Sequence, residues 1–158
     1  MQNKNVCHVA MGQYVATKEL NTTFKTILGS CVAVCLKDYK NKVAGINHYF
    51  YPQMREGSIL EPGKYGNKSI PLLLNEMISM GAELGYIQAK LYGGSAVNNG
   101  KKVAFMNIRL AYNILAKNNI PVIDSDTGGE RGRVITFYPY SFEVIISQTK
   151  EVFTPIKG

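Results

Sequence analysis

The chain has 158 residues, of which 46% are apolar, a size and composition typical of one domain with a packed core. We therefore expect a single domain over residues 1–158. No apolar run approaches the roughly 20 residues that a membrane span needs, and no signal-peptide segment follows the first residues, which predicts a cytoplasmic protein without membrane insertion. The formal net charge of +7 is spread along the chain. It favours an acidic protein partner, or simply solubility, over binding to nucleic acid.

The three cysteines argue against both a disulfide framework and a zinc site. Cys7, Cys31 and Cys35 are odd in number and show no CxxC spacing. In a reducing compartment we expect three free thiols, and the sequence gives no reason to expect a metal or an organic cofactor.

The first third of the chain reads as strands, because β-branched, aromatic and alternating residues are separated by polar turns. The expected strands are Val6 to Val15, Phe24 to Ser30, Val32 to Lys37 and Val43 to Phe50. A long loop with three glycines and a proline is then expected from Gln53 to Lys68. Long loops inside compact domains are often functional.

The remainder alternates between helices and strands. Apolar residues at helical spacing predict helices over Ile70 to Leu84 and Val103 to Lys117. Strands are expected at Ile87 to Tyr92, Val122 to Asp124, Arg133 to Tyr138 and Glu143 to Ser147. The fold class is therefore α+β, with helices covering mainly antiparallel sheets.

The turn after the third strand brings a cysteine and a histidine together. If the loop at Asp38 to Asn41 is centred between Tyr39 and Lys40, then His48 faces Cys31 across the hairpin. Directly opposed residues have Cβ atoms about 5 Å apart, which lets an imidazole reach a thiol. A thiol becomes a strong nucleophile when an adjacent base takes its proton or an imidazolium stabilises the thiolate. A slip of one residue would place the two side chains on opposite faces.

The other cysteines and the second histidine have simpler interpretations. Cys7 and Cys35 are expected to be small buried apolar residues, and His8 is expected to be structural. Cys31 directly follows Gly29 and Ser30, where a glycine turn exposes backbone N–H groups that suit an oxyanion.

Several segments together resemble the CheD family of chemoreceptor glutamine deamidases. The segment from Thr26 to Leu36 contains the Leu-Gly-Ser-Cys run, and His48 follows Cys31 by 17 positions. The resemblance continues through Gly45 to His48, Tyr51-Pro52, Ile70 to Leu73, Lys90 to Gly94, Gly128-Gly129 and Gly132-Arg133.

This resemblance implies a single-domain α/β/β/α sandwich and a protein-glutamine glutaminase with a Cys–His–Thr catalytic set. Carried over to this chain, the cysteine is Cys31 and the histidine is His48. In some members the threonine stands six residues before the cysteine, where this chain has Lys25. Thr26 is the nearest threonine, and it reaches the site only through a local irregularity; otherwise another residue, such as Thr23, fills the role.

The resemblance also implies the partners. They are methyl-accepting chemotaxis receptors, whose cytoplasmic helices carry the glutamines, and a CheC-type phosphatase. The expected reaction is thiolate attack on the carboxamide, a thioester intermediate and hydrolysis to glutamate, with Gly29 and Ser30 near the oxyanion. Two alternatives stay open: a binding module in which Cys31 only packs, and a Cys–His amidase or peptidase with another substrate.

Overall fold

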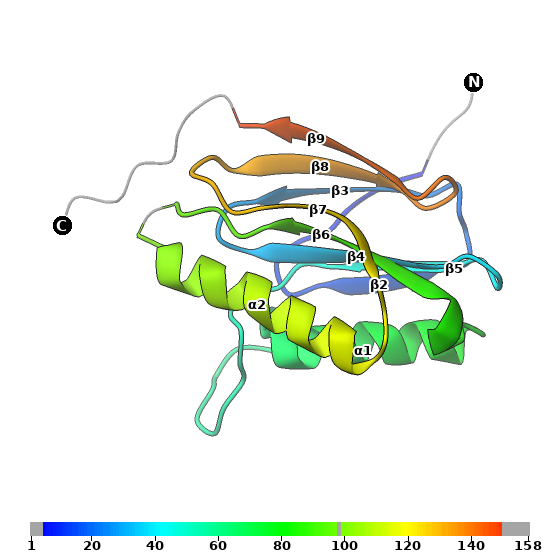
Figure 1. The fold of residues 1–158 in the computed structure, drawn as a ribbon, viewed down its shortest axis with the longest axis horizontal. Helices are drawn as coiled ribbons and strands as arrows, with labels where there is room; N and C mark the ends of the chain where they lie inside the picture. Colours follow the sequence, from blue (N-terminus) through cyan, green and yellow to red (C-terminus); the bar gives the residue numbers. More distant parts are fainter. Residues whose placement is uncertain (1–4, 98, 150–158) are drawn as a thin grey trace.

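The computed structural model describes residues 5–97 and 99–149 and arranges them in three layers (Figure 1). A four-stranded sheet packs against a five-stranded sheet, and two long helices cover the opposite face of the five-stranded sheet. None of the helices in the described ranges is long and apolar enough to cross a membrane.

The four-stranded sheet has the strand order β1-β3-β8-β9. Its strands are β1 (Val6–His8), β3 (Thr23–Leu28), β8 (Arg133–Tyr138) and β9 (Glu143–Gln148). Only β1 and β3 are parallel; the other neighbours are antiparallel.

The five-stranded sheet has the order β2-β5-β4-β6-β7. It contains β2 (Tyr14–Thr17), β4 (Val32–Asp38), β5 (Val43–Asn47), β6 (Ile87–Gly93) and β7 (Val122–Thr127). Here β6 and β7 form the one parallel pair. Consecutive strands β3 and β4 belong to different sheets, so the chain crosses between the sheets at residues 29–31.

The helices are α1 (Gly66–Ser79) and α2 (Lys101–Lys117), with short 3-10 helices at η1 (Pro62–Lys64) and η2 (Leu84–Tyr86). Helix α1 begins inside the loop expected from Gln53 to Lys68 and ends before the expected Leu84. It ends there because the chain turns at Gly81, whose φ of 106° is a conformation that glycine adopts easily.

The α+β class and the sandwich of two mainly antiparallel sheets are confirmed. The fourth layer of the expected α/β/β/α order is not found in residues 5–97 and 99–149, because both long helices pack on the five-stranded sheet. The outer face of the four-stranded sheet instead leaves Ile27 and Ile145 63% and 59% exposed. The described residues thus form an α/β/β order (Figure 1).

The predicted strand from Val6 to Val15 is wrong as a single element. It forms β1 in one sheet and β2 in the other, joined by a turn in which the N–H of Gln13 donates to the carbonyl of Ala10 at 3.0 Å. Gly12 lies in this turn with a φ of 93°, a conformation that ends strand pairing.

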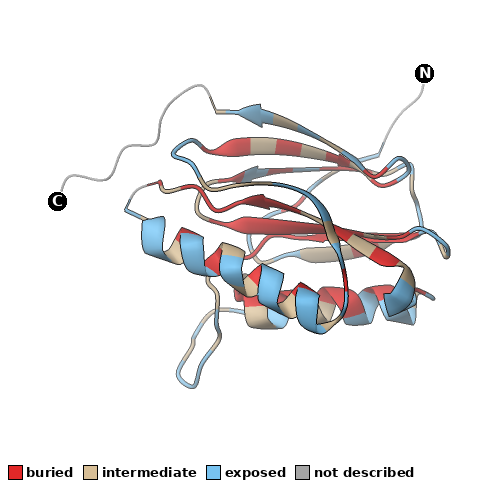
Figure 2. Cartoon of the chain, viewed as in Figure 1, coloured by how far each residue is buried: buried red, intermediate tan, exposed pale blue. Residues whose placement is uncertain are grey.

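The two faces of β4 serve two separate cores. Val32, Val34 and Leu36 pack with both helices, whereas Cys31, Ala33 and Cys35 lie in a second cluster between the sheets. This alternation follows from the two-residue period of a strand. Figure 2 shows the buried residues concentrated along the facing sheets and on the inner side of the helices.

Candidate active site

Cys31 lies in the turn where the chain passes from the four-stranded to the five-stranded sheet. Its residue exposure is 7%, and it belongs to the apolar cluster between the sheets. Cys31 therefore lies among side chains from both sheets and is almost fully shielded from solvent.

The chain after β6 holds this turn through the backbone. The N–H of Gly94 donates to the Cys31 carbonyl and the N–H of Ser95 donates to the Gly29 carbonyl, both at 2.8 Å. Gly93 has a φ of 109°, and a Cβ there would collide with the Cys31 carbonyl oxygen. Glycine is therefore required for this close approach.

These contacts decide which N–H groups are free for an oxyanion. The N–H of Gly94 is already bonded to the Cys31 carbonyl, so it is not a free donor for an oxyanion. In the described part of the chain, no backbone carbonyl accepts from the N–H of Ser30 or Cys31. The turn itself thus offers two neighbouring donors beside the sulfur.

The hairpin register differs from the prediction by two residues. Ile46 pairs with Cys35 instead of Ala33, and an isolated bridge pairs Tyr49 with Val32. His48 therefore does not directly oppose Cys31. Because a shift of two keeps every side chain on its face, His48 still points to the side of the sheet that carries Cys31.

The turn explains the shift. Asp38 pairs with Val43, which leaves a four-residue loop between them. The Asp38 carboxylate accepts from the N–H groups of Lys40 and Asn41 at 2.9 and 2.7 Å, and Lys42 has a φ of 58°. This side-chain capping moves the centre of the loop by one residue.

Thr26 of the four-stranded sheet contacts His48, which directly follows β5 of the five-stranded sheet. Thr26 Oγ1 lies 2.7 Å from His48 Nδ1, and both residues are 5% exposed. No local irregularity is needed, because Thr26 pairs regularly with Ile135 and its neighbours Lys25 and Ile27 point to solvent. Thr26, and not Thr23, therefore makes the contact with His48.

The hydrogen bonds around Thr26 assign the tautomer of His48. The Thr26 hydroxyl donates its single hydrogen to the Val9 carbonyl at 2.7 Å. Its oxygen must then accept from His48 Nδ1–H, which is also directed at the Val9 carbonyl at 3.3 Å. The neutral ring therefore carries its free electron pair on Nε2, the nitrogen suited to act as a base.

His48 Nε2 is buried and has no hydrogen-bond partner within the described residues. A buried polar atom without a partner is unusual and often belongs to a functional site. Cys31 and Nε2 are thus not hydrogen-bonded in the resting protein. Catalytic hydrogen bonds often tighten only when substrate binds.

The resting protonation states follow from burial. Desolvation raises the pKa of Cys31 to about 11, although its own backbone N–H acts in the opposite direction. Burial also lowers the pKa of His48, and the Val9 carbonyl partly offsets this. At neutral pH the pair is a thiol and a neutral imidazole. Of the two routes to activation, this arrangement favours proton removal by a base over a preformed thiolate–imidazolium pair.

Asn107 of α2 connects the two chain segments of the site and was not anticipated. Its Nδ2 donates to the carbonyl of Ser30 at 3.1 Å and to that of Phe50 at 2.8 Å. Ser30 precedes Cys31, and Phe50 follows His48 by two residues. The available signal was an asparagine at a helix position whose neighbours on the same face, Ala104 and Ala111, are buried.

A pocket of about 310 Å³ opens beside the turn at residues 29–31, called here the nucleophile turn. It is lined by Ser30, Phe50, Tyr51, Val97, Gly100 and Val103. The lining is mainly apolar and comes from the segments that precede Cys31 and follow His48, together with the start of α2. A side chain reaching Cys31 has this hollow next to it.

Comparison with known proteins gives the family. The family model for CheD chemotactic sensory transduction matches residues 51–148, a range that begins after Cys31 and His48. A protein from Sulfurimonas denitrificans, named a probable chemoreceptor glutamine deamidase CheD, is 38% identical over 82% of this chain and 86% of its own length. Proteins with the same name from Rhizobium johnstonii and, as CheD 1, from Geobacter sulfurreducens are 36% and 33% identical. The matches cover 85% and 95% of this chain and 74% and 80% of those proteins.

The fold also resembles a solved structure. A Neisseria meningitidis protein of the DUF152 family matches with a TM-score of 0.51 at 12% identity, over 79% of this chain and 64% of that protein. This likeness concerns the fold alone. The relatives and the family model together place this chain in the CheD family.

Proposed function

We propose that this protein deamidates glutamine side chains to glutamate on the cytoplasmic helices of chemotaxis receptors. The observation that carries the proposal is the His48 ring, fixed through Nδ1 by Thr26 and left with an unpartnered Nε2 on the sheet face that carries Cys31. Relatives named chemoreceptor glutamine deamidases supply the substrate class. We place the enzyme in the cytoplasm, where those helices lie, with residues 1–158 as one domain.

The reaction starts with Cys31 and His48. His48 Nε2 takes the thiol proton while the sulfur attacks the carboxamide carbon, which forms a C–S bond and a tetrahedral oxyanion. The free N–H groups of Ser30 and Cys31 donate to that oxygen. Each such donor lowers the barrier by about 2.7–4 kcal/mol in comparable sites.

The second half releases the products. The His48 imidazolium gives its proton to the leaving nitrogen, the C–N bond breaks, and ammonia departs from a thioester. His48 Nε2 then takes a proton from water, whose hydroxide attacks the thioester and restores the thiol. The balance is glutamine plus water to glutamate plus ammonia, and no redox partner is involved.

The positive charge of the protein fits an acidic protein surface as substrate. A CheC-type phosphatase as regulatory partner stays a prediction from the family. The alternative of a binding module with a packing cysteine does not account for the fixed tautomer of His48 or for its free Nε2.

The test is to incubate the protein with cytoplasmic fragments of receptors from the same organism and to follow glutamine-to-glutamate conversion by peptide mass spectrometry. We expect conversion at particular glutamines and none with Cys31→Ala. Binding of the fragments without conversion, together with slow alkylation of Cys31, would support the binding module instead.

A further inference from the structure

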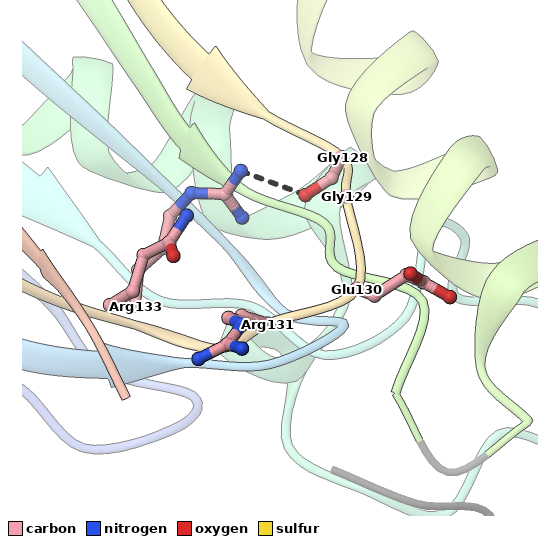
Figure 3. Close-up of a pocket in the computed structure, with 6 residues that line it drawn as sticks. Gly128, Gly129, Glu130, Arg131 and Arg133 are labelled. Atoms are coloured by element: carbon pink, nitrogen blue, oxygen red, sulfur yellow. Dashed lines mark hydrogen bonds between the residues drawn. The ribbon is translucent and has the colours of Figure 1, made fainter. Parts of the chain in front are cut away.

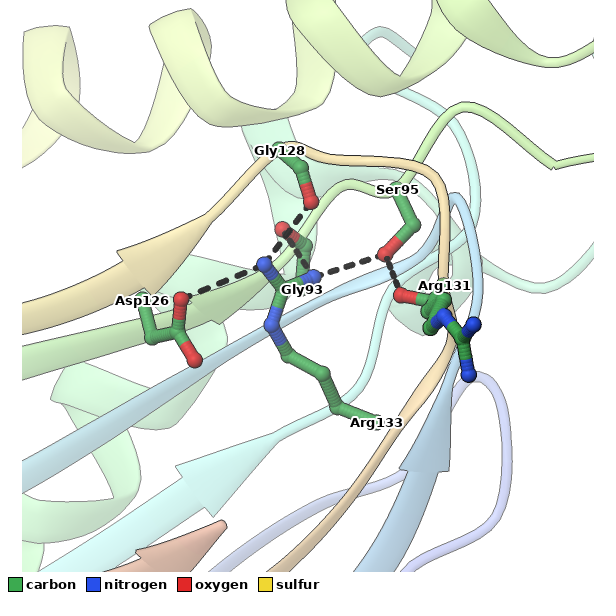
Figure 4. Close-up of polar contacts among 6 residues, drawn as sticks. All are labelled: Gly93, Ser95, Asp126, Gly128, Arg131 and Arg133. Atoms are coloured by element: carbon green, nitrogen blue, oxygen red, sulfur yellow. Dashed lines mark hydrogen bonds and ion pairs between the residues drawn. The ribbon is translucent and has the colours of Figure 1, made fainter. Parts of the chain in front are cut away.

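Arg133 is a buried cation at the end of the molecule that carries Cys31. It begins β8 in the four-stranded sheet, pairs with Leu28, and is 4% exposed. Its guanidinium extends to the five-stranded sheet, where it meets the end of β7 and the chain after β6 (Figure 4). Arg133 thus joins the two sheets where the nucleophile turn crosses between them.

The partners of Arg133 are mostly neutral oxygens. Nη1 donates to Ser95 Oγ at 2.6 Å and Nη2 donates to the Gly128 carbonyl at 2.7 Å. Among the described residues Arg133 makes one ion pair, with Asp126 at 3.3 Å, and that carboxylate side chain is 44% exposed. Arg133 Nε is buried without a partner within the described residues.

Such an arrangement is a poor source of stability. A buried charge loses its hydration, and well-packed apolar residues often replace a buried ion pair without loss of stability. The unpartnered Nε adds to that cost. Positioning of the neighbouring chain segments explains a buried arginine here better than a contribution to stability does.

The contacts lead from Arg133 to the turn before Cys31 in two steps. Ser95 Oγ accepts from Arg133 and donates to the Arg131 carbonyl at 2.6 Å, which fixes the orientation of Ser95 (Figure 4). The backbone N–H of Ser95 then holds the Gly29 carbonyl at 2.8 Å. Next to it, the N–H of Gly94 holds the Cys31 carbonyl.

These two carbonyls flank the N–H groups proposed for the oxyanion. Because a peptide unit is planar, holding the Gly29 carbonyl also fixes the direction of the Ser30 N–H. The Cys31 N–H shares its peptide unit with the Ser30 carbonyl, which Asn107 holds. We propose that Arg133 is a positioning residue that, through Ser95 and the Gly29 carbonyl, aims the Ser30 N–H at the oxyanion of the deamidation reaction. The inference rests on the proposed deamidase function.

Arg131 supplies a matched control two residues away. Both arginines line a hollow of about 320 Å³ with Gly128, Gly129 and Glu130. In Figure 3 the Arg131 side chain points away from the guanidinium of Arg133. Of these two side chains, only that of Arg133 is hydrogen-bonded to Gly128. Only the backbone of Arg131 takes part in the network.

The experiment compares Arg133→Lys with Arg131→Lys in two reactions of Cys31. Lysine keeps the charge but cannot reproduce the two-pronged contact of Nη1 and Nη2. Deamidation of a receptor fragment forms an oxyanion, whereas alkylation by iodoacetamide at the sulfur does not. A positioning error of this kind typically costs about 10²-fold in rate.

We expect Arg133→Lys to lower the kcat of deamidation by about 10- to 100-fold, with little change in KM or in the alkylation rate. Arg131→Lys should match the native protein in both reactions. Equal losses in deamidation and alkylation would show that Arg133 acts on the thiol or on the fold, and an unchanged kcat would remove it from the site. Either result overturns the inference.

A second variant keeps the test decisive if Arg133→Lys folds poorly. Ser95→Ala retains the backbone N–H that donates to the Gly29 carbonyl but loses the hydroxyl to which Arg133 donates. We expect the same separation of kcat from alkylation, and a combined loss in the double variant smaller than the product of the single losses. Independent, multiplicative losses would contradict a path through Ser95. If the native protein is alkylated but deamidates nothing, the proposed function fails, which is a separate outcome.

Discussion

The two faces of the five-stranded sheet carry different kinds of residue. Toward the helices, Val32, Val34 and Leu36 pack with apolar side chains of α1 and α2. Toward the other sheet, β4 presents small residues, and Cys31, His48, Thr26 and Arg133 gather along this layer. The helix-covered face can therefore stabilise the fold while the inter-sheet face holds buried polar groups, some of them unsatisfied. Substitutions on the two faces should separate activity from stability.

The largest expected effect is that of Cys31→Ala. The variant should lose deamidation completely, because no neighbouring group can replace the nucleophile, and its melting temperature should stay close to the native value. Cys35→Ala provides the control: Cys35 faces the same layer but is fully buried, with a pKa raised by desolvation. It should keep its activity and lose some stability. Near-normal deamidation by Cys31→Ala would remove Cys31 from the mechanism.

His48→Ala should come next. General acid–base groups contribute typically about 10²–10⁴-fold, so the deamidation rate should fall by that order, and alkylation of Cys31 should slow as well. The control is His8→Ala, since His8 lies exposed in β1. If the two variants showed the same rates, His48 would not be the base. The inter-sheet face would then no longer differ from the helix-covered face through a catalytic histidine.

The placement of Cys31 and His48 on the same face shows how far the sequence argument reached. The alternating patterns of β4 and β5 predicted both strands, and the correct face survived because the register error was two residues. The register itself depends on the Asp38 carboxylate and on the positive φ of Lys42. A period of two in the pattern contains no information on either.

Residues that act through tertiary contacts could not be identified from the sequence. Asn107 and Arg133 reach the site across some 77 and 38 positions, to Ser30 and Ser95. No local pattern encodes such contacts. The second helical layer came from the family resemblance alone, whereas the exposed Ile27 and Ile145 show that the outer sheet face is open in the described residues.

The pH dependence of alkylation should follow the buried thiol. Because burial raises the pKa of Cys31 to about 11, the thiolate is a minor species at pH 7–9 and grows about tenfold with each pH unit until that pKa. The alkylation rate should climb in the same way, measured by mass spectrometry on the peptide that contains Cys31. A plateau below pH 8 would instead indicate a thiolate already stabilised in the resting protein.

The loss of deamidation at acid pH should follow protonation of His48, not ionisation of Cys31. Because burial lowers the pKa of His48, the ring is mostly neutral at pH 6.5, so most of the activity should be retained there and should decline at lower pH.

Thr26→Val should reduce the rate by about tenfold, an order suited to loss of one orienting hydrogen bond. It frees the ring to adopt the other tautomer, so the kcat should fall while substrate KM stays near native. A Thr26→Ser variant should restore the rate, which a role in packing alone would not predict.

The smallest effect on chemistry is expected on the helix-covered face. Leu73 of α1 is fully buried there, and Leu73→Ala should lower the free energy of unfolding by about 2–5 kcal/mol through lost contacts and a residual cavity. Leu73 also contacts the position of Gly45, where a Cβ would lie 2.7 Å from its Cδ1, so α1 packs tightly on β5. Chemical denaturation measures the stability, and kcat is measured well below the melting temperature so that the variant is folded. We expect kcat to be native, because the sheet separates Leu73 from Cys31 and His48. A kcat that fell together with stability would show that helix packing is transmitted through β5 to His48, and that the two faces are coupled.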